Sequence, residues 1–133
     1  MADVDFVVAA VVLRDGDGRV LVVRKRGTSR YMLPGGKIEP GETPAAAAVR
    51  ELHEEVGADL DVGDLVPLGV WTAPAANEPG HTVRGHVFEH PWVSGLSVRA
   101  EIDDLMWLHP TEMGARSDLA PLLVTCVLPA LLS

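Results

Sequence analysis

One expected helix, over residues 44–56, constrains the fold of this chain more than any other segment. Thr43 can cap its N-terminus, Pro44 suits the first helical turn, and Gly57 can end it in a left-handed conformation. Its apolar side chains recur at helical spacing and form one stripe that must pack against a core. The stripe consists of Ala45, Ala48, Val49, Leu52 and Val56.

Apolar strand-like runs occupy much of the remaining chain. Residues 6–13 form a continuous valine-rich run, as expected of a strand that is covered on both faces. The turn signal at 15–18 and the apolar run at 20–23 predict an antiparallel hairpin with that strand. A last helix is expected from Asp118, with a bend near Pro129. Further strands are expected over residues 65–72, 82–89 and 105–108.

The order of these elements predicts an α/β fold. Strands and helices interleave, which favours a mixed β-sheet sandwiched between helices in an α/β/α arrangement. The sequence contains no repeat, no low-complexity linker and no shift in composition. We therefore expect residues 1–133 to form a single domain.

Charge and composition exclude several classes of partner. The formal net charge is −8, and no basic run is longer than Arg24–Arg26, so a nucleic acid polymer is not expected as a partner. The single cysteine, Cys126, cannot form an internal disulfide, which fits a reducing compartment. The apolar run at 6–13 is too short for a membrane span or a signal peptide, so a cytoplasmic location is expected.

Three glutamates gather on the polar side of the expected helix. Glu51, Glu54 and Glu55 lie within about a 100° arc, opposite the apolar stripe. Such carboxylates are either a solvated acidic face or oxygen ligands for Mg²⁺, which prefers one or two carboxylates, water and substrate phosphates. As an i,i+4 pair of like charges, Glu51 and Glu55 destabilise an isolated helix.

The residues around these glutamates favour the metal site. Gly35 and Gly36 follow Pro34 and would let main-chain atoms approach a metal or a phosphate, because glycine has no side chain. Arg50 can hold a carboxylate in a fixed orientation by charge-assisted hydrogen bonds. A glycine turn, an arginine and stacked carboxylates together suit metal-assisted displacement at phosphorus.

The pattern Gly-x5-Glu-x7-Arg-Glu-Leu-x-Glu-Glu-x-Gly, starting at Gly36, resembles the Nudix box of the Nudix (MutT-like) hydrolases. One window matches all its fixed positions by chance with a probability on the order of 10⁻⁸ or less. Ala58 departs from the pattern, since the family has a larger aliphatic residue at this packing position. The seven residues at positions of fixed identity are Gly36, Glu42, Arg50, Glu51, Glu54, Glu55 and Gly57, and Leu52 also matches the pattern as written.

The resemblance implies a Nudix fold and Mg²⁺- or Mn²⁺-dependent attack of water on a diphosphate. It makes Glu51 and Glu55 the principal metal ligands and Glu54 a further ligand, with a main-chain carbonyl near Gly36 completing the coordination. Glu54 and Glu55 are thereby catalytic candidates. Arg50 would orient the glutamates, and Glu42 would be partly structural.

The general base lies outside the box in many family members. Glu101 precedes Trp107 by six residues, a spacing similar to that of MutT-type members, which makes Glu101 a candidate metal ligand or base. The competing interpretation is a solvated loop glutamate beside Asp103 and Asp104. Glu78 and Glu89 are weaker candidates for the same role.

Substrate selection depends on residues outside the box. Arg24, Lys37 and Arg84 are candidate substrate-binding residues, because each could donate to a phosphate. The competing interpretation is a set of surface cations at strand ends. Pro74 stands sixteen residues past Ala58, a distance associated with ADP-ribose pyrophosphatases in the family.

The resemblance therefore implies hydrolysis of a nucleoside diphosphate derivative, either a nucleoside triphosphate (oxidised forms included) or a nucleotide sugar. The alternatives are an ADP-ribose-type pyrophosphatase and a non-catalytic Nudix domain that binds a nucleotide as a sensor. A sensor would be expected to lose box glutamates, and this chain keeps them all. Homodimers are common among family members, so a second copy of the chain is one candidate partner beside the small nucleotide.

Overall fold

The computed structural model describes residues 4–133, which form two β-sheets with helices packed around them. A four-stranded sheet has the order β3-β1-β5-β4, and a two-stranded sheet pairs β2 with β6. Strand β1 is parallel to β5 and antiparallel to β3, so the larger sheet is mixed. The strands are β1 (Phe6–Leu13), β2 (Val20–Lys25), β3 (Gly35–Lys37), β4 (Val66–Pro74), β5 (Thr82–His90) and β6 (Ile102–Leu108).

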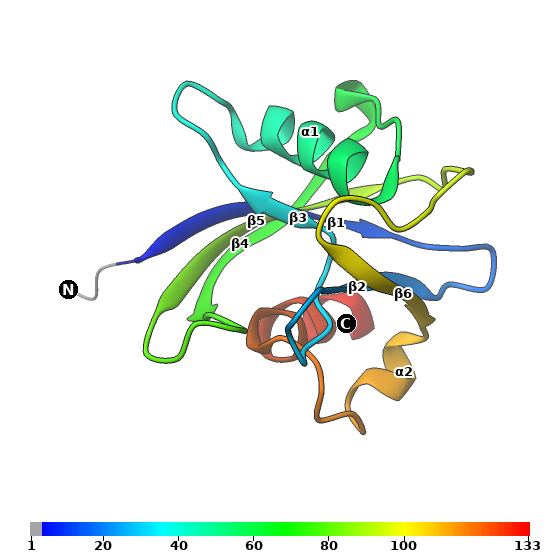
Figure 1. Cartoon of the computed structure of the whole chain (residues 1–133). Coiled ribbons are helices and arrows are strands. Elements are labelled where there is room, and N and C mark those ends of the chain that lie inside the picture. The colour runs from blue at the N-terminus through cyan, green and yellow to red at the C-terminus, as the bar shows by residue number, and fades with distance from the viewer. Residues whose placement is uncertain (1–3) are drawn as a thin grey trace.

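The helical segments lie on both sides of the sheets (Figure 1). Helix α1 packs on β1 and β3, and the C-terminal helical segment covers the opposite face. The expected α/β/α arrangement is therefore confirmed. The helical elements are α1 (Pro44–Val56), the 3₁₀ turn η1 (Val62–Asp64), α2 (Pro110–Met113), the π-helical turn η2 (Leu123–Val127) and α3 (Leu128–Leu132).

Strand β1 divides the core into two halves, because successive side chains of a strand point to opposite faces. Ala9 and Val11 pack with the cluster under α1, whereas Ala10 and Val12 pack with the cluster under the C-terminal helical segment. All four are buried. This explains why the sequence of β1 is continuously apolar instead of alternating.

The start and the end of α1 follow the sequence, whereas its buried face differs in part: Ala47 and Glu55 are also buried, and Ala45 and Val49 of the predicted stripe are only half-buried. The Thr43 hydroxyl accepts a hydrogen bond from the N–H of Ala46 at 3.1 Å, and Gly57 has the left-handed φ of 70°. Leu52 and Val56 are fully buried, and burying such a side chain stabilises by about 1.5–3 kcal/mol. Ala58 is buried in the same cluster, as expected of a packing position.

The predicted hairpin between the first two strands is wrong. Strand β1 uses its two edges to pair with β3 and β5, and β2 pairs with β6 in the other sheet. Within the described chain, one bridge between Arg14 and Val20 joins the two strands around a tight turn. The turn signal was correct, but a strand with both edges occupied cannot accept a third partner.

The last helix also differs from the prediction. Asp118 does not cap it, because its carboxylate accepts two hydrogen bonds from Arg116, at 2.9 and 2.7 Å. The helical segment starts at Pro121. The N–H of Leu128 donates to the carbonyl of Leu123, which widens this turn just before Pro129. A wide turn fits beside a proline, which cannot donate a main-chain hydrogen bond.

None of the helices formed by residues 4–133 is both long enough and apolar enough to cross a membrane.

Candidate active site

The glycine turn and the carboxylate helix are in direct contact. A Cβ on Gly35 would lie 2.1 Å from the carbonyl oxygen of Ala9, so only glycine lets β3 pack this closely on β1. The N–H of Gly35 donates to Oε1 of Glu55 at 3.0 Å. A Cβ on Gly36 would lie 2.6 Å from both carboxylate oxygens of Glu51. The turn thus brings its main chain against two of the predicted metal ligands.

Glu55 is one of the few buried charged residues, with 6% of its surface exposed. Burial, with smaller contributions from the charges of Glu51 and Glu101, raises the pKa of the Glu55 carboxyl to about 7. The hydrogen bond from Gly35 and the charge of Lys25 act in the opposite direction. A buried carboxylate surrounded by like charges is a site that a cation would stabilise.

Arg50 holds the loop before α1 and the carboxylates together. Its Nε and Nη2 donate to the two carboxylate oxygens of Glu42 at 2.6 and 2.9 Å, and Nη1 donates to Glu51 at 2.8 Å. Its Nη2 also donates to the carbonyl of Lys37 at 3.1 Å. The Arg50 guanidinium, followed by the N–H of Glu39, lowers the pKa of Glu42 to about 2. Arg50 therefore contacts the Glu51 carboxylate and the loop before α1 at the same time.

Glu54 differs from its two neighbours in exposure. Its side chain is 52% exposed, and its contact with Nη1 of Arg50 is long, at 3.4 Å. The helical period explains this difference, since Glu54 is rotated away from the sheet while Glu55 faces the glycine turn. The structure brings Glu51 and Glu55 together at Gly35 and Gly36 and leaves Glu54 at the rim.

The donor set fits a hard divalent cation. Between residues 4 and 133, no three or more His, Cys, Asp or Glu side chains are grouped as a ready-made metal site. Mg²⁺ does not require such a cage, because one or two carboxylates, water and substrate phosphates usually hold it. Glu51 and Glu55 supply the oxygen donors, and Gly36 leaves the space beside Glu51 free of a side chain.

A cavity of about 200 Å³ adjoins the glycine turn. Its walls are mainly apolar and include residues of β1, of β3 and of the start of the C-terminal helical segment. Lys25 and Lys37 supply positive charge in this lining. Its apolar lining includes Phe6, Val8, Ala10, Met32, Leu33, Pro74, Val83, Leu122 and Leu123.

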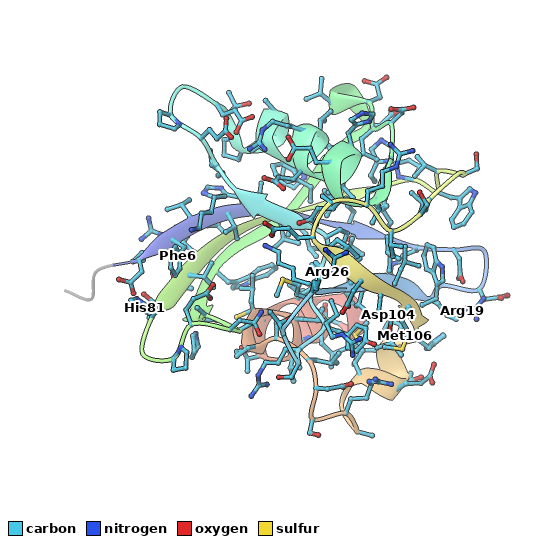
Figure 2. The ribbon with its side chains drawn as sticks, in the orientation of Figure 1. Phe6, Arg19, Arg26, His81, Asp104 and Met106 are labelled. Carbon is cyan, nitrogen blue, oxygen red and sulfur yellow. The ribbon has the colours of Figure 1, made fainter. Side chains whose placement is uncertain are left out.

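Lys37 is the predicted substrate-binding residue that lies in this cavity. Its Nζ sits over the ring of Phe6, 4.4 Å from the centroid, in a cation–π contact. The ring of Phe6 also lies near that of His81, with the two ring centroids 5.7 Å apart. Figure 2 shows Phe6 and His81 together at one end of the larger sheet.

Arg24 and Arg84 lie apart from the cavity lining. Arg24 donates to Asp103 at 3.2 Å, and its guanidinium carbon lies 5.2 Å from the ring centroid of Tyr31. Arg84 is exposed on the face of β5 opposite Val83, which lines the cavity. The alternation of the strand separates them, although the sequence alone does not show which face meets a cavity.

Glu101 lies in the loop before β6, near the carboxylates of α1. Its side chain is exposed, and its carbonyl accepts a hydrogen bond from the N–H of Arg26 at 2.7 Å. It is close enough to raise the pKa of Glu55. Glu78 lines the cavity, and Glu89 is half-buried on β5.

The sequence analysis selected neither Phe6 nor Thr28 nor Lys25 as a candidate site residue. All three line the cavity. Phe6 belonged to an apolar run that was interpreted only as core. Lys25 is the last residue of β2 and lines the cavity beside the glycine turn. The sequence alone does not show whether the side chain of Arg24 or that of Lys25 faces this cavity.

Comparison with known proteins decides the family. The sequence profile of the NUDIX domain matches residues 5–125. The chain belongs to the Nudix hydrolase family. It is 34% identical over 113 residues to a MutT-like protein of Streptomyces ambofaciens, which covers 82% of this chain and 66% of the relative. It is 32% identical over 110 residues to the CTP pyrophosphohydrolase of Escherichia coli K12, which covers 80% of this chain and 76% of the relative.

Solved structures show the same fold. The MutT protein from Methanosarcina mazei Go1 superposes on this Nudix hydrolase with a TM-score of 0.78 at 19% identity. The match covers 98% of this chain and 93% of that protein. Nudix hydrolases use divalent metal ions, which agrees with the oxygen donors of Glu51 and Glu55 beside the glycine turn.

Proposed function

We propose that this Nudix hydrolase splits nucleoside triphosphates, oxidised forms included, into a nucleoside monophosphate and pyrophosphate with Mg²⁺. One observation carries the proposal. The Glu51 and Glu55 carboxylates contact the glycine turn at Gly35 and Gly36, and that turn opens onto a mainly apolar cavity. A metal-binding end and positive charge suit the phosphates of a nucleotide, and the apolar compartment suits its nucleoside.

The residues of the site would divide the chemistry as follows. Glu51 and Glu55 would hold the cation, with the carbonyl of Gly36 and the rim carboxylate of Glu54 as further donors. When bound, the cation supplies neutralisation of phosphate charge and a lowered pKa for a coordinated water. Lys37 and Lys25 would donate hydrogen bonds to phosphate oxygens of the substrate.

Glu101 would accept the proton of the attacking water. The water oxygen forms a bond to phosphorus as the bridging phosphorus–oxygen bond breaks, and the departing group, either pyrophosphate or the nucleoside monophosphate, keeps the electron pair. A role as base is favoured over a role as metal ligand. Glu51 and Glu55 contact the glycine turn, whereas the exposed Glu101 side chain belongs to a separate loop and acts on Glu55 through its charge.

A triphosphate is favoured over a nucleotide sugar. The Escherichia coli relative is named as a CTP pyrophosphohydrolase, and this chain aligns with 76% of it. The cavity has a volume of about 200 Å³, below the roughly 300–1,000 Å³ of typical ligand pockets, which favours a substrate with a single nucleoside over one that carries a second sugar. Pro74, whose spacing is associated with ADP-ribose pyrophosphatases, lines the same cavity, so ADP-ribose is the second candidate substrate.

The test is a substrate screen of the purified full chain with Mg²⁺. The panel contains the four common nucleoside triphosphates, oxidised guanine triphosphates, ADP-ribose, dinucleoside polyphosphates and sugar nucleotides. We expect a triphosphate to yield monophosphate and pyrophosphate in equal amounts, a chelator to abolish the reaction and added Mg²⁺ to restore it. Hydrolysis of ADP-ribose alone would select the second candidate. Tight binding without hydrolysis of any compound would select the sensor function and overturn the proposal.

A further inference from the structure

The C-terminal end of α1 is closed by two segments of the chain. The first is local, since the N–H groups of Gly57 and Ala58 donate to the carbonyls of His53 and Leu52 at 3.0 and 3.2 Å. This arrangement satisfies carbonyls that a helix end leaves without partners.

The second segment is the loop between β5 and β6. The N–H of Arg99 donates to the carbonyl of Glu55, and the N–H of Ser97 donates to the carbonyl of Val56, each at 3.0 Å. The main chain of a proposed metal ligand is thus hydrogen-bonded to a residue two positions before Glu101. The loop is attached to the same helical turn that presents Glu55.

A tight turn separates this attachment from β6. The N–H of Ile102 donates to the carbonyl of Arg99 at 3.0 Å, which closes a turn with Ala100 and Glu101 at its centre. The carbonyl of Glu101 accepts from the N–H of Arg26, a residue labelled in Figure 2. Main-chain bonds therefore hold the turn on both sides of Glu101.

Ala100 takes an unusual conformation in this turn. Its φ is 51°, and between residues 4 and 133 it is the only residue other than glycine with a positive φ. In this region the Cβ of an L residue crowds the carbonyl oxygen, and a turn position with positive φ favours glycine. Strained residues of this kind persist where the surrounding structure enforces them, often at functional sites.

The side chain of Arg99 makes a further contact with α1. A Cβ on Gly57 would lie 2.7 Å from the guanidinium carbon of Arg99, so the guanidinium lies directly against the helix end. A cation is favourable there, because the C-terminus of a helix carries partial negative charge. The loop is thus held to α1 by its main chain and by one side chain.

We propose that Ala100 is a positioning residue, which holds Glu101 at a set place relative to Glu55 for the reaction proposed above. The inference rests on that proposed function, because it concerns the group that would accept the proton. Alanine suits the role better than glycine. Glycine would adopt the same φ without strain but would also sample many others, and the methyl group of alanine restricts the turn.

The experiment compares four variants with the parent chain: Ala100→Gly, Glu101→Gln, the double variant, and Ala115→Gly as the control. Ala115 is exposed in a turn and has no positive φ. We expect Ala100→Gly to keep or raise the midpoint of thermal unfolding, because strain is released. Its kcat should nevertheless fall by about tenfold at unchanged KM, because Glu101 is less well placed. The control should lose slight stability and keep its kcat.

Two further measurements separate positioning from general damage. In the metal-free protein, Ala100→Gly should speed amide hydrogen exchange at residues 99–102 and leave α1 unchanged. In the Glu101→Gln background, Ala100→Gly should lower kcat no further, because the group that it positions is gone.

Three outcomes would overturn the inference: parental kcat in Ala100→Gly, an equal fall in the Glu101→Gln background, or parental exchange at residues 99–102. Full activity of Glu101→Gln would refute the base assignment and the inference together. If the parent chain hydrolysed nothing in the substrate screen, the proposed function would fail separately. The exchange measurement would then still decide whether Ala100 restrains Glu101.

Discussion

The N–H of Gly35 donates to the carboxylate of Glu55 across 3.0 Å, joining the central sheet to the helix that covers it. The two residues stand twenty positions apart in the chain. This bond explains why the glycine turn and the glutamates form one motif, because the turn presents a main-chain donor to a carboxylate that the core buries.

Glu55→Gln is the first prediction. Glutamine keeps an oxygen that can accept from Gly35, so the fold should persist, but it loses the negative charge that a metal requires. We expect kcat to fall by about two orders of magnitude or more. Circular dichroism should show an unchanged fold.

Glu54→Gln is the comparison for this prediction. Its side chain is 52% exposed and contacts only the rim of the site, so kcat should fall much less than in Glu55→Gln. Equal hydrolysis by Glu55→Gln and the parent chain would refute the assignment of Glu55 as a metal ligand.

The stability of the metal-free protein should depend on pH through Glu55. Its pKa is raised from 4.5 to about 7, so between these values the folded protein binds a proton that the unfolded chain has released. The free energy of unfolding should therefore decrease as pH rises from about 4.5 to 7, by up to about 3 kcal/mol. Urea unfolding at pH 5 and pH 8 measures this difference in the free energy of unfolding.

The same measurement has two controls. Glu55→Gln should lose this pH dependence, because glutamine does not titrate. Mg²⁺ should restore stability at pH 8, since a bound cation takes the place of the proton. If the free energy of unfolding of Glu55→Gln fell equally with rising pH, the pH dependence would belong to another group.

Gly36→Ala should displace a carboxylate without disturbing the core. The new Cβ would lie 2.6 Å from both oxygens of Glu51, so that side chain must move. Misplacing a catalytic group by about 1 Å can lower activity up to about a hundredfold, and we expect a loss of that order with a higher Mg²⁺ requirement. Gly16→Ala is the control, because a Cβ there meets nothing within 4 Å. Parental activity in Gly36→Ala would show that Glu51 does not act from this position.

The elements that sequence patterns predicted well are those decided by local interactions. Helix α1 is capped by Thr43, begins at Pro44 and ends before Gly57, as expected, because caps and the helical period act within a few residues. The predicted pairing of β1 with β2 was wrong. A strand has two edges, and the sequence does not show that β3 and β5 pair with both edges of β1.

The same limit applies to the candidate site. The box predicted that one helix carries Glu51 and Glu55, and both carboxylates contact the glycine turn, while their role as metal ligands stays a prediction. The difference in burial between Glu54 and Glu55 depends on the glycine turn from another segment. Arg24 is paired with Asp103, 79 positions away, and no local pattern predicts that contact. Ala100 carries no signal either, because alanine rarely takes a positive φ.

Glu42→Gln is the last prediction, and it concerns the ion pair that supports Glu51. The Arg50 guanidinium lowers the pKa of Glu42 from 4.5 to about 2, so as pH falls the unfolded chain binds a proton at Glu42 before the folded protein does. This pair stabilises the fold fully above pH 4.5, and its contribution is lost as pH falls toward 2. Glu42→Gln should therefore unfold at a lower temperature than the parent at pH 7, and the difference should shrink at pH 3.

The same substitution should also affect the site. Because Arg50 also donates to Glu51, loss of its partner Glu42 should weaken Mg²⁺ affinity or activity by about 10–100-fold. Asp17→Asn, which removes an exposed contact with Arg19 at 3.6 Å, should change neither property. A stability loss in Glu42→Gln with unchanged Mg²⁺ dependence would limit Glu42 to a structural role.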